Sequence, residues 1–218
     1  NNLTKNYWNK IHNKYERADI IYDDWLDIFL DDINSCELPI IDLGCGSGND
    51  SKYLIEHGKK VIACDYAENA VENVRKNFPE LMDAKCFDMT DRLPFSDGYA
   101  GIVIADLSLH YFSEEVTKNI LKDIKRVLCD KGILIFRVNS INDVNHGAGQ
   151  GTEVEHHYYL NEANGRYKRF FDRADINNFF SDWNIEYAEE EKMDRYELLK
   201  ILWRGKVSKN SKKIYIDE

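Results

Sequence analysis

The sequence lacks the features of a membrane or secreted protein. None of its apolar runs approaches the roughly 18 residues that a membrane helix needs. No basic flank leads into an apolar stretch near Asn1, as a secretory signal would require. The cysteines make an odd number, and no two have the C-x-x-C spacing of a zinc ribbon or thiol redox site: they are Cys36, Cys45, Cys64, Cys86 and Cys129. We therefore expect a cytoplasmic protein with reduced cysteines and no membrane partner.

The sequence also has fewer basic than acidic residues. The chain has 29 Lys and Arg against 39 Asp and Glu, which gives a formal net charge of −10. Such a surface repels polyphosphate, so we expect no nucleic-acid partner. The one basic run of note, residues 206–213, lies in a polar stretch and predicts a flexible tail over residues 206–218. The sequence predicts no particular oligomeric state.

From residue 39 onward, short apolar runs alternate with longer amphipathic stretches. The runs are candidate buried strands and cover residues 40–43, 61–64, 84–87, 101–105 and 132–136. The stretches between them predict helices over residues 49–57, stopped by Gly58, over 67–78, stopped by Pro79, and over 113–128. This alternation predicts an α/β fold with a doubly wound, mostly parallel Rossmann-like sheet and helices on both faces.

We expect a single domain over residues 1–218. Residues 1–36 predict an N-terminal helical cap, in which Trp25, Ile28, Phe29 and Ile33 form the apolar face of an amphipathic helix. Residues 38–138 form the sheet core. Residues 140–205 predict a long Gly-rich loop, a hairpin around residues 161–165, a helix capped by Asp172 and a final strand within 198–203.

The strongest local motif is Asp42-Leu43-Gly44-Cys45-Gly46-Ser47-Gly48, where a buried strand runs into a glycine-rich turn and then a helix. Glycines permit positive φ and let a ligand approach the backbone, and the helix N-terminus beyond them favours an anionic group. About twenty residues on, the next strand ends at Asp65, a carboxylate placed to bind both hydroxyls of a ribose. The third glycine of a dinucleotide fingerprint would fall at Asn49, which weakens the nicotinamide interpretation.

These residues, with Phe87-Asp88-Met89 and Ala105-Asp106-Leu107, resemble the successive cofactor motifs of class I S-adenosylmethionine-dependent methyltransferases. The resemblance covers residues 38–138. The length and simple layout are similar to the small-molecule branch of that class, which includes tellurite-resistance and thiopurine methyltransferases. The resemblance implies a methyltransferase that uses S-adenosylmethionine, releases S-adenosylhomocysteine and acts on a small-molecule substrate. Residues 38–138 would then bind the cofactor, and residues 140–205 would lie on the acceptor side.

The resemblance also implies roles for single residues. Asp42, Gly44 and Gly46 would surround the methionine part of the cofactor, with Cys45 contributing its backbone. Asp65 would bind the ribose and Tyr66 would lie against the adenine. Asp88 would face the adenine amino group beside Met89, and Asp106 and Leu107 would lie near the methionine amino group and the methyl.

Methyl transfer from S-adenosylmethionine depends more on an aligned acceptor than on reactive side chains of the protein. A hydroxyl or protonated amine acceptor needs a base, and His110, just after the fourth strand, is the candidate base or acceptor-positioning residue. Tyr111 and His146 are further candidates for contact with the substrate. No metal site is expected, because adjacent residues such as His156 and His157 point in different directions on any regular element.

Two alternatives remain open from the residues. One is an NAD(P)-dependent oxidoreductase, which would use the same glycine turn and Asp65. The other is a non-catalytic module that binds S-adenosylmethionine. The fourth-strand motif Ala105-Asp106-Leu107-Ser108 lacks the Asn/Asp-Pro-Pro-Tyr/Phe pattern of nucleobase and glutamine methylases, which argues against those substrates.

Overall fold

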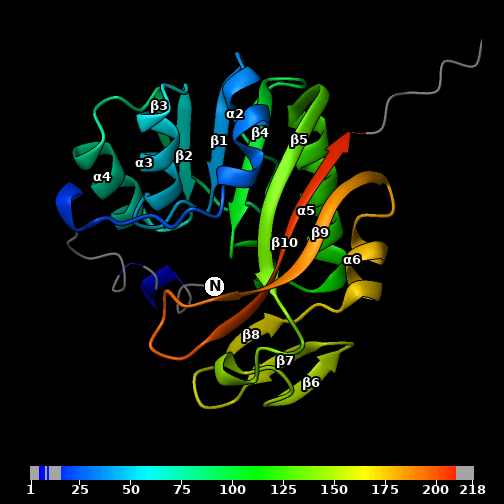
Figure 1. The fold of residues 1–218 in the computed structure, drawn as a ribbon. Helices are drawn as coiled ribbons and strands as arrows, with labels where there is room; N and C mark the ends of the chain where they lie inside the picture. Colours follow the sequence, from blue (N-terminus) through cyan, green and yellow to red (C-terminus); the bar gives the residue numbers. More distant parts are fainter. Residues whose placement is uncertain (1–4, 8, 10–15, 210–218) are drawn as a thin grey trace, which may run out of the picture.

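The structure is a computed structural model that describes residues 5–7, 9 and 16–209. Seven strands of the described residues form the main sheet, in the order β3-β2-β1-β4-β5-β10-β9 (Figure 1). They are β1 (Ile40–Leu43), β2 (Val61–Asp65), β3 (Asp83–Cys86), β4 (Ala100–Asp106), β5 (Leu128–Asn139), β9 (Trp183–Met193) and β10 (Lys200–Lys209). Strands β1 to β5 pair in parallel, and β10 runs antiparallel to both β5 and β9. The predicted α/β fold with a mostly parallel sheet is confirmed.

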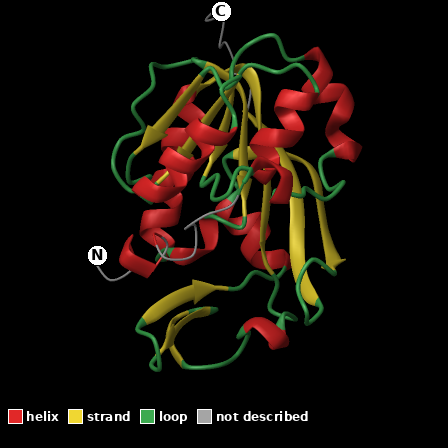
Figure 2. Cartoon of the chain, turned by 90° about the vertical axis from the view of Figure 1, so that its left-hand side faces the viewer, coloured by secondary structure: helices red, strands yellow, loops and turns green. Residues whose placement is uncertain are grey.

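Helices cover both faces of this sheet, as Figure 2 shows. One face carries α2 (Leu30–Ser35), α3 (Asn49–Glu56) and α4 (Glu68–Asn77), and the other carries α5 (Glu114–Val127) and α6 (Arg173–Phe179). Along β4, Ile102 and Ile104 pack toward the first layer while Val103 and Ala105 pack toward the second. A strand buried on both faces must be apolar at every position, which is why continuous apolar runs predicted the strands.

The helix ends agree with the capping residues in the sequence. Ser113 caps α5 by accepting a hydrogen bond from Val116 N, and Asp172 caps α6 by accepting one from Asp175 N. The predicted helices over 49–57, 67–78 and 113–128 correspond to α3, α4 and α5, each within one residue at either end. These helices place the loops after β1, β2 and β4 at one edge of the sheet.

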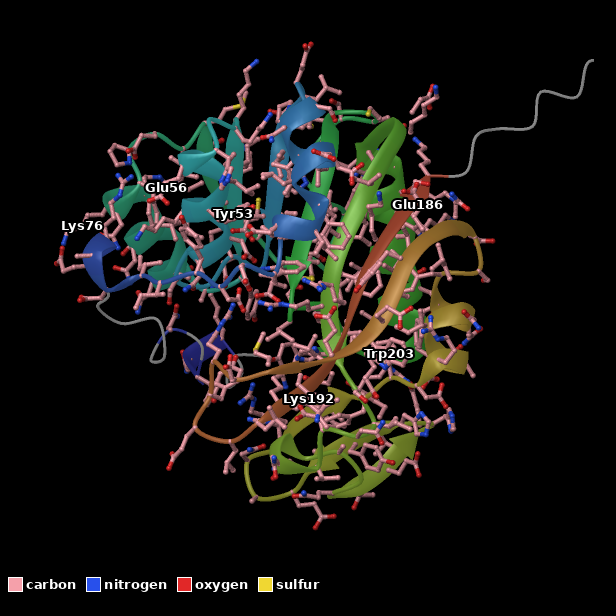
Figure 3. The ribbon with its side chains drawn as sticks, in the orientation of Figure 1. Tyr53, Glu56, Lys76, Glu186, Lys192 and Trp203 are labelled. Carbon is pink, nitrogen blue, oxygen red and sulfur yellow. The ribbon has the colours of Figure 1, made fainter. Side chains whose placement is uncertain are left out.

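The N-terminal region differs from the predicted cap. Its described part contains the 3-10 helices η1 (Arg17–Asp19) and η2 (Asp27–Phe29) followed by α2. Trp25, Phe29 and Ile33 are buried against the sheet, but Ile28 is 51% exposed, so the predicted apolar face was wrong at that position. The described part of this segment belongs to the helical layer on one face of the main sheet. The hydroxyl of Tyr53 on α3, which Figure 3 labels, donates a hydrogen bond to Asp27 of η2 at 2.7 Å and so ties η2 to α3 within this layer. Residues 1–4, 8 and 10–15 of the predicted cap lie outside the described residues.

The predicted long loop over residues 140–165 contains regular structure. After η4 (Val144–His146), the strands β6 (Thr152–Glu155), β7 (Tyr158–Asn161) and β8 (Arg166–Arg169) form a small antiparallel sheet. The hairpin around residues 161–165 is confirmed, but β6 was missed because all four of its residues are exposed and carry no apolar period. Figure 1 shows the small sheet facing the carboxyl ends of β1, β4 and β5.

The predicted tail over residues 206–218 was wrong for its first part. Strand β10 continues to Lys209, and Lys206 forms ion pairs with Asp32 at 2.9 Å and Glu186 at 2.8 Å. The absence of a side chain at Gly205 makes room for Phe136, whose ring a Cβ there would meet at 2.2 Å. The strand predicted within residues 198–203 therefore begins and ends later, and residues 210–218 lie outside the described residues. Within the described part of the chain, no helix has the length and apolar character to cross a membrane.

Candidate active site

A cleft of about 490 Å³ opens at the carboxyl edge of the main sheet, and we call it the main cleft. Nine of the ten residues expected to bind the cofactor line it, namely Gly44, Cys45, Gly46, Asp65, Tyr66, Asp88, Met89, Asp106 and Leu107. Its other lining residues are Ser47, Asn49, Asp50, Thr90, Ser108, Tyr111, Phe112, Arg195 and Tyr196. The carboxyl edge of parallel strands is where open α/β sheets bind their ligands.

The glycine turn between β1 and α3 forms one wall of the main cleft. Gly44 has a φ of +84° and Gly48 a φ of +87°, which L side chains rarely adopt. A Cβ on Gly44 would lie 2.5 Å from the Cβ of Ser108. The backbone amides of Gly44 and Cys45 donate to Cys64 O at 2.8 and 2.9 Å, which holds the turn against β2. Burial raises the pKa of the Cys45 thiol well above its usual value, so this residue offers the cleft backbone and a neutral thiol.

Asp65 links the glycine turn to the next βα connection. Its Oδ2 accepts a hydrogen bond from Gly46 N at 2.9 Å, and its Oδ1 accepts one from Ala67 N at 2.8 Å. Each carboxylate oxygen can accept a second hydrogen bond. Asp65 is thus held rigidly by two backbone groups with acceptor capacity left for a ligand's hydroxyls.

The opposite wall comes from the loops after β3 and β4. Asp88 Oδ1 accepts hydrogen bonds from Thr90 N at 2.9 Å and Thr90 Oγ1 at 2.7 Å, which orders the turn that carries Met89. Leu107 has a φ of +53°, a strained conformation for a branched side chain. Strain of this kind is often found at functional sites, and here it turns the chain at the end of β4 into the main cleft.

A charged network that the motifs did not predict lies beneath the cleft. The Arg137 guanidinium, 3% exposed, donates two hydrogen bonds to Asp106 at 2.6 and 2.8 Å and two to Asp23 at 2.9 and 3.5 Å. Arg195 donates to Asp23 at 2.8 Å. Burial opposes ionisation of Asp23, but the two guanidinium groups outweigh it and hold its pKa below the usual value. The sequence could have revealed Arg137 as a site residue, because it is an arginine inside an otherwise apolar strand. It gave no such signal for Arg195.

Two buried carboxyls lie behind the glycine turn. Asp42 is 1% exposed and does not line the cleft; its Oδ2 accepts a hydrogen bond from Ser51 Oγ at 2.6 Å. Burial, together with the Asp106 and Asp65 charges, raises the pKa of Asp42 to about 7. Burial also raises the pKa of Asp50, which accepts a hydrogen bond from Trp25 Nε1 at 2.8 Å. Burial thus favours the neutral form of both carboxyl groups, and a cationic ligand in the cleft would favour their ionisation.

The acceptor candidates fall in different places. Tyr111 lines the main cleft, whereas His110 is buried beside it at 2% exposure. No hydrogen-bond partner for His110 Nδ1 exists among the described residues. Burial, followed by nearby cationic side chains, lowers the pKa of His110 well below its usual value, so the imidazole is neutral at pH 7 and a poor base. His146 lies outside the main cleft and pairs with Asp143 at 2.8 Å.

His146 instead lines a separate cavity of about 280 Å³, which we call the side cavity. Its other lining residues come mainly from the small sheet: Gly147, Gln150, Gly151, Tyr159, Asn161, Glu162, Asn164, Arg166, Lys168 and Phe170. Neither Arg166 nor Lys168 was predicted as a site residue, because a basic residue on a short polar hairpin is typical of a solvated surface.

The expectation of no metal site assumed that His156 and His157 point apart, and this assumption was wrong. His157 has a φ of +55°, so it does not continue a strand, and the rings of His156 and His157 lie 3.7 Å apart. Their nitrogens come within 4.8 Å of carboxylate oxygens of Asp172 and Asp175. His157 Nδ1 already pairs with Asp175 at 2.7 Å, and both aspartates cap α6. The absence of a metal stays a prediction.

The sequence comparison agrees with the position of the main cleft. Residues 41–136 match the family model described as a methyltransferase domain. Among curated relatives, a putative methyltransferase of Bacillus subtilis is 35% identical over 109 residues, which are 46% of this chain and 42% of that protein. The chain spans less than half the length of the curated relatives it matches.

Solved structures share the fold at low sequence identity. An S-adenosylmethionine-dependent methyltransferase from Anabaena variabilis superposes with a TM-score of 0.67 at 16% identity, covering 96% of this chain and 94% of that one. The 1,6-didemethyltoxoflavin-N1-methyltransferase of Burkholderia thailandensis, solved with its substrate and S-adenosylhomocysteine, has a TM-score of 0.62 at 15% identity, covering 87% and 84%. The main sheet and its helices are therefore the class I methyltransferase fold.

Proposed function

We propose that this chain, whose residues 41–136 form a class I S-adenosylmethionine-dependent methyltransferase domain, transfers a methyl group to a small-molecule acceptor. The observation that carries the proposal is the convergence of nine motif residues on one cleft beside a domain match of this type. The same match favours this function over an NAD(P)-dependent oxidoreductase. The small-molecule acceptor is supported by the size of the cleft and by the deficit of basic residues, which disfavours nucleic acid.

The donor set fits S-adenosylmethionine. Asp65 retains acceptor capacity for two ribose hydroxyls, and Tyr66, Asp88 and Met89 stand where the adenine would be held. Gly44 and Gly46 would lie along the methionine part, with the carboxyl groups of Asp42 and Asp50 behind them. A cleft floor with raised carboxyl pKa values suits a ligand that carries both an ammonium and a sulfonium.

The cofactor supplies an activated methyl group on its sulfonium, so the protein's task is alignment and exclusion of water. Arg137 fixes the Asp106 carboxylate, and this in turn orders the strained Leu107 turn that would stand beside the methyl. Alignment to within about 3–3.5 Å can supply a large part of the rate enhancement of such a displacement. We assign His110 the role of a positioning residue because burial lowers its pKa, which makes its imidazole a weak proton acceptor.

We propose that the molecule is one domain in which residues 140–205 form the acceptor side. Described residues of the N-terminal segment support closure over the cleft, since the Asn69 amide hydrogen-bonds Asn9 Oδ1 at 3.2 Å while Arg166 of β8 stacks on Tyr7 at 3.9 Å.

We place the reaction in the cytoplasm, because the five cysteines are free thiols and Cys86 is exposed, which suits a reducing compartment.

Isothermal titration with S-adenosylhomocysteine tests the proposal, run beside reduced nicotinamide dinucleotide. We expect saturable binding of S-adenosylhomocysteine alone. Binding of the nicotinamide cofactor alone would favour the oxidoreductase, and binding of neither by folded protein would remove the proposal. Cofactor binding without methyl transfer to any acceptor in a broad small-molecule panel would favour the non-catalytic module.

A further inference from the structure

Strand β8 carries a cluster of basic residues, although the chain as a whole has a negative net charge. Lys168 and Arg166 line the side cavity, and Lys200 of β10 is buried next to it at 5% exposure. We propose that the methyl acceptor carries an oxyanion, a carboxylate or a phosphate, which binds in the side cavity against Lys168 and Arg166. This inference rests on the proposed function, because it names the chemical class of that enzyme's acceptor.

Lys168 is the first support. Its Nζ donates to His146 O at 3.4 Å, a long hydrogen bond, and no carboxylate among the described residues lies within 4.0 Å of it. Burial lowers the pKa of Lys168, and the Lys200 and Arg166 charges lower it further. Even a half-buried ammonium is costly unless it is paired, so the site gains stability from an anion.

The nearest carboxylate is already engaged. Asp143 is fully buried and its Oδ2 accepts a hydrogen bond from Lys200 Nζ at 2.7 Å. Its Oδ1 accepts from Ile201 N at 3.0 Å and lies 2.8 Å from His146 Nδ1. Asp143 therefore balances Lys200, and among the described residues Lys168 has no carboxylate of its own within 4.0 Å. Glu162 also lines the cavity, but it is exposed and accepts a hydrogen bond from Thr152.

No residue lines both cavities, but two residues of the side cavity lie close to aromatic residues of the main cleft. Arg166 lies 5.8 Å from the ring of Tyr111, which lines the main cleft. The His146 ring, in the side cavity, lies 5.5 Å from the ring of Tyr196, which also lines the main cleft. An acceptor anchored by its anionic end at Lys168 would extend past Tyr111 and Tyr196 toward the methyl. The buried His110 Nδ1 has no hydrogen-bond partner among the described residues, and the charges of Lys168 and Arg166 act on this imidazole. His110 therefore offers the acceptor a polar contact between Lys168 and the methyl.

Direct titration of two simple anions tests the inference. Inorganic phosphate and benzoate are titrated separately into the full-length protein, with and without saturating S-adenosylhomocysteine. We expect saturable binding of at least one anion, weakened about tenfold or more by Lys168→Met through loss of a charge-assisted contact. Lys168→Arg should retain most of the affinity. Lys76→Met removes a lysine on α4, far from the small sheet (Figure 3), and should change nothing.

The arms of the experiment separate the possible outcomes. Phosphate binding alone identifies a phosphorylated acceptor, and benzoate binding alone identifies a carboxylate. Absence of saturable binding for both anions, or equal weakening by Lys168→Met and Lys76→Met, overturns the inference. S-adenosylhomocysteine affinity should be unchanged in Lys168→Met, because Lys168 does not line the main cleft. If S-adenosylhomocysteine fails to bind the wild type, the proposed function falls, while the phosphate and benzoate results still report on the side cavity.

Discussion

Asp65 is the residue whose contacts define the proposed cofactor end of the main cleft, since both its oxygens accept backbone hydrogen bonds from the turns that form the cleft wall. We expect Asp65→Asn to weaken S-adenosylhomocysteine binding by about 1–3 kcal/mol, because a charge-assisted hydrogen bond to the ribose becomes a neutral one. Titration calorimetry measures this. Glu72→Gln, an exposed acid on α4, is the control, and an unchanged affinity in Asp65→Asn would place the ribose elsewhere.

The raised pKa of Asp42 predicts that the stability of the protein depends on pH. Its pKa is raised from 3.8 to about 7 in the folded state, so the folded protein holds a proton there that the unfolded chain has lost. Stability therefore falls as pH rises across that window. Asp42→Asn, which cannot ionise, should be more stable than wild type at pH 8 by at least about 1 kcal/mol, or about 2–4 °C in Tm.

The same comparison carries its own control. The difference between Asp42→Asn and wild type should shrink steadily as pH falls from 8 to 4, which is close to the unfolded-state pKa of 3.8, and the exposed Asp91→Asn should show no such trend. Thermal melts over this pH range check it. A variant less stable than wild type at pH 8 would show that Asp42 is ionised and favourably paired.

At the scale of elements, the turn between β1 and α3 depends on the absence of a side chain at Gly44. Gly44→Ala places a Cβ 2.5 Å from the Cβ of Ser108 at a φ of +84°, so the turn must move away from β4. We expect S-adenosylhomocysteine affinity to fall by about tenfold or more. Gly58→Ala has a similar φ of +72° but open space around it, so it should lose only about 1–2 kcal/mol of stability and keep its affinity. Equal effects on binding would mean that backbone strain alone matters.

The small sheet depends on Arg169, which is 2% exposed. Its guanidinium donates to His156 O at 2.8 Å and to Glu155, and lies 5.2 Å from the ring of Phe179 on α6. Arg169→Met should loosen the small sheet from the core at a cost of about 1–3 kcal/mol, because it removes the hydrogen bonds that a buried guanidinium makes to His156 O and Glu155. Limited proteolysis should then cleave within residues 140–171 sooner than in wild type. The exposed Arg92→Met is the control, and equal cleavage of both variants would contradict this role.

For the whole molecule, the features that burial and local motifs determine could be predicted from the sequence. Strands buried on both faces carry continuous apolar runs, and the acids that end them share one edge of the sheet, so the motif residues converged as expected. Contacts between distant parts of the chain were not predictable in this way. Asp23 and Arg195 meet across 172 positions, and β6 is an exposed strand with no apolar period. The residues of the proposed cofactor site could therefore be predicted from the sequence, whereas those of the proposed acceptor side required the structure.

The central claim is that S-adenosylmethionine binds in the main cleft with its ribose on Asp65. A crystal structure of the protein grown with S-adenosylhomocysteine tests it most directly. We predict both ribose hydroxyls within about 2.5–3.0 Å of the Asp65 carboxylate, as for O–H···O hydrogen bonds. The adenine should lie beside Tyr66 and Met89. Density for the ligand at any other place, with the main cleft empty, would contradict this claim.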